Sequence, residues 1–169
     1  MLVLGIGNTL LGDEGAGVRA MEMMRDSHPK TAIRYVDGGT LSFTLTRFIE
    51  EADCLVVFDA ANFGGNAGEW KCYLDAGMDD FLAKRGRSVH EVSLSDLLDI
   101  ARLTERLPTR RAMFGIQTRA VGWSDRLSPQ VAAAVREASS AAWELVQSWS
   151  GLERSIPQMD SPGGSDLLT

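Results

Sequence analysis

The chain has 169 residues, 44% hydrophobic and 7% aromatic, which suits one globular domain with a single core. Its formal net charge is −6 and its basic residues are dispersed, which argues against a nucleic-acid groove, because such a groove needs a coherent positive face. No apolar run approaches the roughly twenty residues that span a bilayer, so we expect a cytoplasmic protein without membrane insertion.

The first third of the chain repeats a unit of strand, loop and helix. An apolar run stops at Gly7-Asn8 and gives way to helical spacing, and the same succession recurs after a second short run. Residues 55–58 have no polar interruption, the pattern of a strand buried on both faces. The expected strands are residues 2–6, 32–36 and 53–60, and the expected helices are residues 14–24 and 41–51.

The remaining elements are less regular. Apolar and polar residues alternate over 68–74, which is typical of an edge strand, but the alternation does not give its direction. Ser93 or Ser95 is a suitable N-cap for one helix, and Pro129 after Ser128 suits the first position of another. In chain order we expect a strand at 68–74, a polar stretch at 75–87, a helix at 93–103, a strand at 112–117 and a long amphipathic helix from Pro129 to about Trp149.

This alternation predicts an α/β protein, a three-layer α/β/α sandwich around a mostly parallel sheet. We expect one domain over residues 1–150 and a flexible C-terminal tail over 151–169, because the tail is rich in Ser, Pro, Gly and Asp. Ligand chemistry in such sheets gathers at the carboxyl ends of the strands. The loops after residues 6, 36, 59 and 117 are therefore the places to look for a site.

The first of these loops opens like a dinucleotide-binding turn but departs from that pattern. Leu10 takes the place of the third glycine of Gly-x-Gly-x-x-Gly, where a side chain would crowd the contact between helix and strand. Asp13 and Glu14 place negative charge where a pyrophosphate would lie. Nucleotide binding is therefore disfavoured, although the two acids also fit a helix N-terminus stabilised by the macrodipole.

Three polar side chains follow strands or precede a helix where loops can converge: Glu14, Asp59 and His90. Two carboxylates and one imidazole offset a divalent charge and leave coordination positions for water or substrate, which suits nickel, zinc or manganese. Each has a structural alternative, since Asp59 could bind loop amides and His90 could cap a helix or lie on the surface. Three ligands are fewer than a closed structural site uses, so we expect weak metal affinity in the free protein.

Asp37, in Val36-Asp37-Gly38-Gly39-Thr40, is a further acid at the same edge. Its glycines suggest a close approach of backbone, such as that of a peptide, but a turn-capping aspartate explains the pattern equally well. Other hydrolytic chemistries lack their signatures. Leu94 replaces the second histidine of a zincin motif, there is no Gly-x-Ser-x-Gly, and neither cysteine lies in a recognisable catalytic pattern.

Six blocks carry a family resemblance over about residues 2–147. They are LGIGNTLLGDEGAGV at 4–18, DGGT at 37–40, DA at 59–60, Ser88-Val89-His90 with Leu94, Asp96 and Leu97, FGIQ at 114–117 and LSP at 127–129. In these blocks the chain resembles the nickel-iron hydrogenase maturation proteases. The resemblance implies an endopeptidase that removes the C-terminal extension of the nickel-loaded precursor of a hydrogenase large subunit. It also implies a five-stranded sheet in which 68–74 is the one antiparallel strand.

The resemblance also implies roles for the candidate residues. Glu14, Asp59 and His90 are the expected metal ligands, for nickel supplied by the substrate, and Asp37, Glu14 and Asp59 are the expected catalytic acids. Two mechanisms remain open: either the metal activates a water, or an acid acts as general base as in an aspartyl protease. The alternative function is a nickel-binding maturation chaperone without proteolytic activity. We expect the protein to act as a monomer.

Overall fold

The computed structural model describes residues 1–29, 32–85, 91–119 and 122–154. Its five strands form a single sheet in the order β2-β1-β3-β5-β4. The two pairs formed by β1 and the β3–β5 pair are parallel, whereas β4 runs antiparallel to β5. This confirms the mostly parallel five-stranded sheet with one antiparallel strand. The strands are β1 (Leu2–Ile6), β2 (Arg34–Gly39), β3 (Cys54–Ala61), β4 (Trp70–Leu74) and β5 (Arg110–Gln117).

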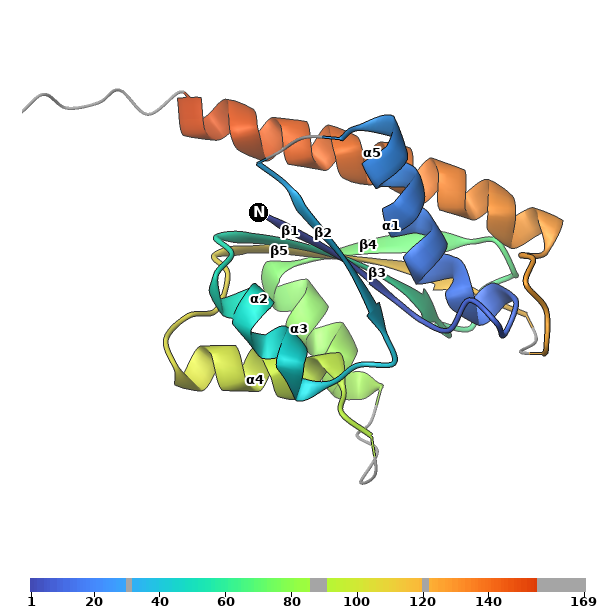
Figure 1. The fold of residues 1–169 in the computed structure, drawn as a ribbon, viewed down its shortest axis with the longest axis horizontal. Helices are drawn as coiled ribbons and strands as arrows, with labels where there is room; N and C mark the ends of the chain where they lie inside the picture. The colour runs from blue at the N-terminus through green and yellow to red at the C-terminus, as the bar shows by residue number, and fades with distance from the viewer. Residues whose placement is uncertain (30–31, 86–90, 120–121, 155–169) are drawn as a thin grey trace, which may run out of the picture.

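Helices cover both faces of the sheet, which confirms the three-layer sandwich (Figure 1). One face packs against α1 (Ala16–Ser27) and α5 (Pro129–Arg154), and the other against α2 (Thr46–Glu50), α3 (Asp75–Lys84) and α4 (Leu94–Leu103). Because side chains of a strand alternate between faces, β3 sends Val56 and Phe58 to the first core and Leu55 and Val57 to the second. This double burial explains why residues 55–58 lack a polar residue.

The main difference from the sequence prediction is α3, which occupies most of the expected polar stretch 75–87. Two of its side chains, Met78 and Leu82, are buried in the core one helical turn apart, Phe81 is partly buried beside them, and the other residues of the helix are polar or small. Two buried positions in ten residues are too few to mark a helix by periodicity. The structure also begins α4 with the predicted cap, since Ser93 and Asp96 form a reciprocal capping box.

The last helix is longer than predicted and continues to Arg154 instead of ending near Trp149. It therefore crosses residue 150, where the sequence placed the end of the domain, while most of the expected tail (155–169) lies outside the described residues. Among the described residues, no helix has the length and apolar character needed to cross a membrane.

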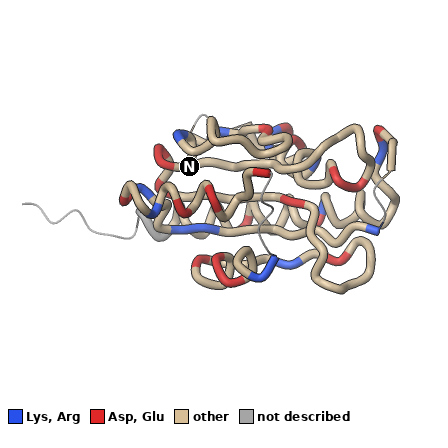
Figure 2. The backbone as a smooth tube through the Cα atoms, turned by 90° about the horizontal axis from the view of Figure 1, so that it is seen from below, with Lys and Arg blue, Asp and Glu red and all other residues tan. Residues whose placement is uncertain are grey.

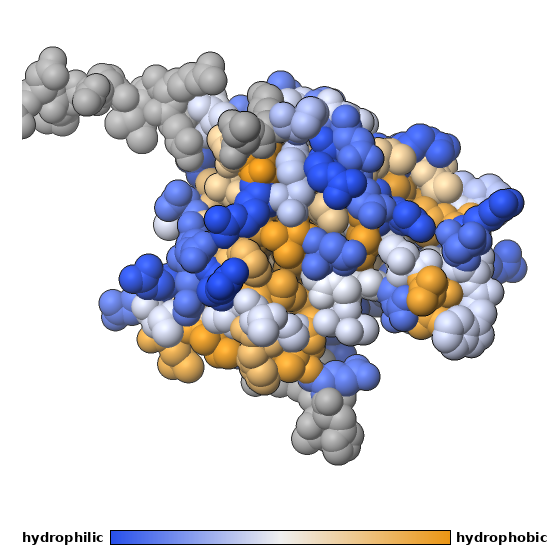
Figure 3. Space-filling model, viewed as in Figure 1, coloured by the Kyte–Doolittle hydropathy of each residue, from blue (hydrophilic) through white to orange (hydrophobic). Residues whose placement is uncertain are grey.

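Charged and apolar residues are distributed differently over the surface. Figure 2 shows acidic and basic segments interspersed along the backbone, in keeping with the dispersed charge of the sequence. Figure 3 shows apolar side chains exposed over the helical layer that contains α2 and α4. Large exposed apolar residues of that layer are Phe43, just before α2, and Leu103, the last residue of α4.

Candidate active site at the carboxyl edge of the sheet

Glu14 lies in a short 3-10 turn, η1 (Asp13–Gly15), that packs beside the carboxyl ends of the central strands. Gly7, at the end of β1, has φ +133°, and a Cβ there would lie 2.0 Å from the carbonyl oxygen of Glu14. Glycine at this position is therefore required for the turn to pack against β1. The predicted helix start at residue 14 is thus two residues early, because α1 begins only at Ala16.

The neighbouring acid, Asp13, has a structural role that the sequence did not reveal. Its side chain is buried, and its carboxylate accepts hydrogen bonds from the backbone N–H of Ser128 (2.7 Å) and from the Ser128 hydroxyl (2.9 Å). Asp13 therefore ties η1 to the start of α5. Asp13 and Glu14 form the first turn of η1, which leads directly into α1, so both acids lie at the start of this helical segment, as the structural alternative for them requires. Only Glu14 remains available for chemistry.

Asp59 lies near the carboxyl end of β3, on the face of the sheet that carries α3. Its side chain is 13% exposed and forms an ion pair with Arg85, whose Nη1 lies 2.6 Å from Oδ2 of Asp59. The second guanidinium nitrogen donates to the carbonyl oxygen of Ala60 at 3.3 Å. Arg85 immediately follows α3, so the helix that the sequence did not predict brings a positive charge to Asp59.

The electrostatics of Asp59 link it to Glu14. Burial raises the pKa of Asp59 from 3.8 to about 6, even though the charge and hydrogen bond of Arg85 lower it. The negative charge of Glu14 makes a smaller contribution that also raises the pKa of Asp59, which indicates that the two carboxylates are near enough to interact. Such a pair favours a cation between or beside its members. In the described structure, that cation is the guanidinium of Arg85.

The raised pKa predicts a pH-dependent stability. Because the folded state holds the Asp59 proton more tightly than the unfolded chain, the free energy of unfolding should fall as pH rises from about 4 to about 6. The full change is at most about 3 kcal/mol, at 1.36 kcal/mol per pKa unit. Urea denaturation of the wild type and Asp59→Asn at several pH values isolates this group. The wild type should lose stability relative to the variant as pH rises, and a pH-independent difference would refute the assignment.

Asp37 lies at the same edge, where β2 pairs with β1 and Gly5 is its neighbour in register. Its side chain is exposed, and its Oδ1 accepts a hydrogen bond from the N–H of Gly39 at 2.8 Å. Gly39 has φ +47° and its carbonyl accepts the N–H of Gly7 at 3.0 Å. The turn-capping interaction is therefore present, and it uses only one of the two carboxylate oxygens of Asp37.

His90 lies outside the described residues, within the segment 86–90. Of the three expected ligands, the structure therefore places Glu14 and Asp59 at the carboxyl edge of the sheet and gives no position for His90. Across the described ranges, no group of three or more His, Cys, Asp or Glu side chains is arranged to hold a metal ion.

Gln117, the last residue of β5, organises a loop at this edge of the sheet. It is buried, and its Oε1 accepts the backbone N–H groups of Phe63 (2.9 Å) and Gly65 (3.2 Å). Its Nε2 donates to the carbonyl of Thr118 at 3.0 Å. Gln117 thus positions the loop that follows β3. The sequence marked Gln117 only as part of the FGIQ block, and its spacing carried no signal for this contact.

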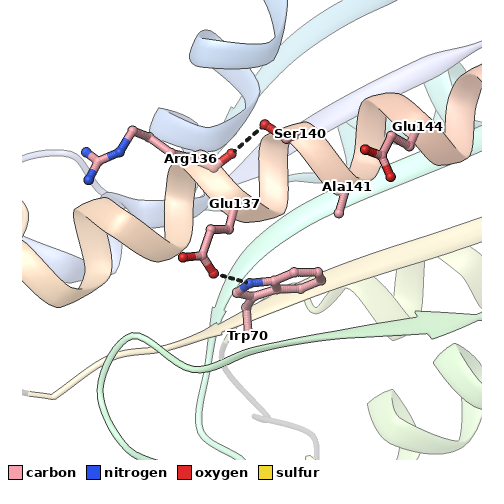
Figure 4. Close-up of a pocket in the computed structure, with 6 residues that line it drawn as sticks. All are labelled: Trp70, Arg136, Glu137, Ser140, Ala141 and Glu144. Carbon is pink, nitrogen blue, oxygen red and sulfur yellow. Dashed lines mark hydrogen bonds between the residues drawn. The ribbon is translucent and has the colours of Figure 1, made fainter.

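A shallow depression of about 430 Å³ lies elsewhere, between β4 and α5 (Figure 4). The indole N–H of Trp70 donates to Glu137 at 3.1 Å across it. Trp70 packs with the α1 and α5 core, whereas Asp59 follows the alternation of Leu55 and Val57 toward the opposite face. The depression is therefore separate from the acid pair, and none of the predicted site residues lines it.

Known proteins are similar to this chain in sequence. The family model of hydrogenase maturation proteases matches residues 18–145. Hydrogenase expression/formation protein HupD of Rhodobacter capsulatus is 36% identical over 155 residues, which cover 90% of this chain and 73% of that protein. Hydrogenase 2 maturation protease of Escherichia coli is 30% identical over 139 residues, 82% of this chain and 85% of that one.

Solved structures agree with the sequence comparison. The hydrogenase maturating endopeptidase HybD from E. coli superposes with a TM-score of 0.74 at 27% identity, covering 92% of this chain and 93% of that chain. An E. coli endopeptidase studied in solution gives a TM-score of 0.73 at 29% identity, over 95% and 98% of the two chains. By family match, relatives and fold together, the chain belongs to the hydrogenase maturation proteases and is an endopeptidase of hydrogenase maturation.

Proposed function

We propose that the protein removes the C-terminal extension of a hydrogenase large-subunit precursor after nickel has been inserted into that subunit. The observation that carries this proposal is a maturation-protease fold with two carboxylates, Glu14 in η1 and Asp59 near the end of β3, at the carboxyl edge of the sheet. A nickel ion carried by the precursor supplies the positive charge that this pair favours.

The donor set suits recognition of an ion that belongs to the substrate. Glu14 and Asp59 offer carboxylate oxygens, and we propose His90 as the nitrogen donor that completes the set. Two or three ligands from this chain leave coordination positions for the ligands that the precursor already provides. Nickel is thus part of the substrate, and the free enzyme holds no metal tightly.

For the hydrolytic step we propose the acids Asp37, Glu14 and Asp59. The raised pKa of Asp59, about 6, lies close to neutral pH, where a group exchanges protons most effectively as a general base or acid. The exposed Asp37, beside the Gly38-Gly39 backbone, is suited to meet a peptide. Either the metal-assisted or the aspartic-type mechanism uses these groups, and both need Asp59 in its ionised form to receive a cation.

A cleavage assay with two forms of the precursor tests this function. Nickel-loaded and nickel-free large-subunit precursors are incubated with the protein, and the products are followed by gel mobility and by mass spectrometry of the released peptide. The proposal predicts shortening of the nickel-loaded precursor alone. Transfer of nickel without shortening would instead establish the chaperone alternative.

Two exposed apolar side chains on loops at the carboxyl edge of the sheet suggest the surface that receives the precursor. Leu10 is 60% and Trp123 is 87% exposed, on loops that follow β1 and β5. The loops are held together by the bonds Gly12 N–H to Ser124 O (2.7 Å) and Ser124 N–H to Leu10 O (3.1 Å). Large apolar side chains on such fixed loops are suited to act as anchors for a protein partner.

Trp123→Ala should therefore raise the KM for precursor about tenfold and leave kcat nearly unchanged, as expected for an interface anchor remote from the bond cleaved. Leu103→Ala is the matched control, because Leu103 is 85% exposed but ends α4, which leads to the amino end of β5. Steady-state kinetics of both variants decide the matter. Equal KM values for the two variants would exclude Trp123 from the docking surface.

We also propose that residues 1–150 contain the catalytic domain, that the segment from 151 onward is dispensable for catalysis, and that the protein acts as a cytoplasmic monomer. The proposal is supported by a sheet and two cores that are complete within residues 2–149. Since α5 runs to Arg154, a truncation intended to preserve the helix should end after that residue.

A further inference from the structure

Arg85 forms an ion pair with the carboxylate of Asp59, which is a proposed ligand of the substrate's metal ion. Its Nη1 lies 2.6 Å from Oδ2 of Asp59, and its other nitrogen is bonded to the carbonyl of Ala60. The guanidinium carbon lies 5.9 Å from the ring centroid of Phe81, which in turn stacks on Tyr73 at 4.1 Å. The positive group is thus held by a carboxylate, a carbonyl and an aromatic ring together.

This contact has a direct effect on metal binding. A divalent ion bound to Asp59 would lie next to a guanidinium that occupies one oxygen of the same carboxylate, and the two like charges would repel each other. The ion must therefore displace Arg85 before Asp59 becomes a full ligand. Displacement is sterically feasible, because the Arg85 side chain is 36% exposed and lies just beyond the last turn of α3.

We propose that Arg85 is a specificity-determining residue that weakens the binding of free metal ions to Asp59 and yields far more readily to an ion delivered by a bound protein. The inference rests on the proposed function of the acid pair. A free hydrated cation has only its own attraction to Glu14 and Asp59 with which to break the ion pair. A cation fixed in the precursor arrives with the binding free energy of the whole protein interface, which offsets the loss of the Arg85 contacts.

The same reasoning explains how the enzyme would distinguish loaded from empty precursor. When the docked precursor carries no metal ion, Arg85 stays paired with Asp59, because the precursor offers no cation to replace the guanidinium. With the ion in place, the guanidinium exchanges for the metal, and the acid pair keeps a positive partner throughout. If Asp59 were not a metal ligand, its ion pair with Arg85 would contribute to folding without influencing metal affinity, so the two roles are separable by experiment.

The test is a calorimetric titration of the purified protein with nickel chloride. Arg85→Gln should bind nickel about tenfold more tightly than the wild type, a gain between those expected from fully exposed and fully buried ion pairs. Arg25→Gln is the matched control, because Arg25 is an exposed arginine that pairs with Asp26 near the end of α1. Its nickel affinity should equal that of the wild type. The double variant Arg85→Gln/Asp59→Asn should lose the gain.

Unchanged or weaker nickel binding by Arg85→Gln would overturn the proposal, as would a gain that persists in the double variant. Thermal melts establish that each variant is folded, and Arg85→Lys, which keeps the charge without the planar fork, gives a smaller gain if Arg85→Gln does not fold. Cleavage of nickel-loaded precursor by the wild type is measured in parallel. If the wild type cleaves the precursor but Arg85→Gln binds nickel no more tightly than the wild type, only the role of Arg85 is rejected. If the wild type does not cleave the precursor, the proposed function is rejected, and this inference with it.

Discussion

Replacing Asp59 by asparagine should lower the rate of processing of nickel-loaded precursor at least about a hundredfold. Even the removal of a residue that only hydrogen-bonds to a metal ligand lowers metal affinity or activity by up to about a hundredfold. Asparagine keeps the shape of the side chain but has no negative charge with which to bind the ion. The fold should survive, because a neutral amide avoids the cost of burying a negative charge, the cost that raises the pKa of Asp59.

Asp53→Asn is the appropriate control for this substitution. Asp53 is an exposed acid immediately before β3, so it lies at the opposite end of the strand from Asp59. The control should process precursor at the wild-type rate. A folded Asp59→Asn protein that retains wild-type cleavage would remove Asp59 from the site.

Gly17→Ala should destabilise the protein by about 3 kcal/mol, the upper part of the range for overpacking a core. A Cβ at position 17 would lie 2.3 Å from the carbonyl oxygen of Ile6 and 2.4 Å from that of Phe58. These are backbone atoms of β1 and β3, which cannot rotate away as a flexible side chain would. The clash must therefore push α1 away from the two strands whose ends carry the acid pair.

Gly77→Ala provides the comparison for Gly17→Ala. Gly77 lies in α3, and a Cβ there would meet nothing within 4 Å. This substitution should stabilise the protein by up to about 1 kcal/mol, because alanine favours the helix and restricts the unfolded chain. Urea denaturation measures both effects. If the two variants had the same stability, close packing of α1 on the strand ends would not be what requires glycine at position 17.

The sequence predicted the centre of the sheet well because β1, β3 and β5 are buried on both faces. An uninterrupted apolar run such as residues 55–58 has few alternatives, and a glycine turn marks its end. It did not predict α3, because only Met78 and Leu82 are buried there. The dinucleotide-turn argument also used the wrong position. The close approach of helix to strand occurs at Gly17, well after Leu10, so the side chain of Leu10 remains exposed.

The candidate site was predictable to the extent that it follows from strand ends. Parallel strands bring their carboxyl ends to one edge, so Glu14 and Asp59 could be placed near each other without knowledge of any contact. Arg85 could not be predicted, because its position depends on where an unpredicted helix ends. The buried bond from Asp13 to Ser128 joins residues 115 positions apart, and no local pattern signals such a contact.

The central claim is that the acid pair Glu14 and Asp59 receives the nickel ion. Crystals of the wild-type protein soaked in millimolar nickel, measured at the nickel absorption edge, locate the ion by its anomalous scattering. The claim predicts a peak within about 2.2 Å of carboxylate oxygens of both residues, the usual distance for metal–carboxylate bonds, with Arg85 displaced from Asp59. A peak elsewhere, such as at the acids of α3, together with an intact Arg85–Asp59 pair would contradict it.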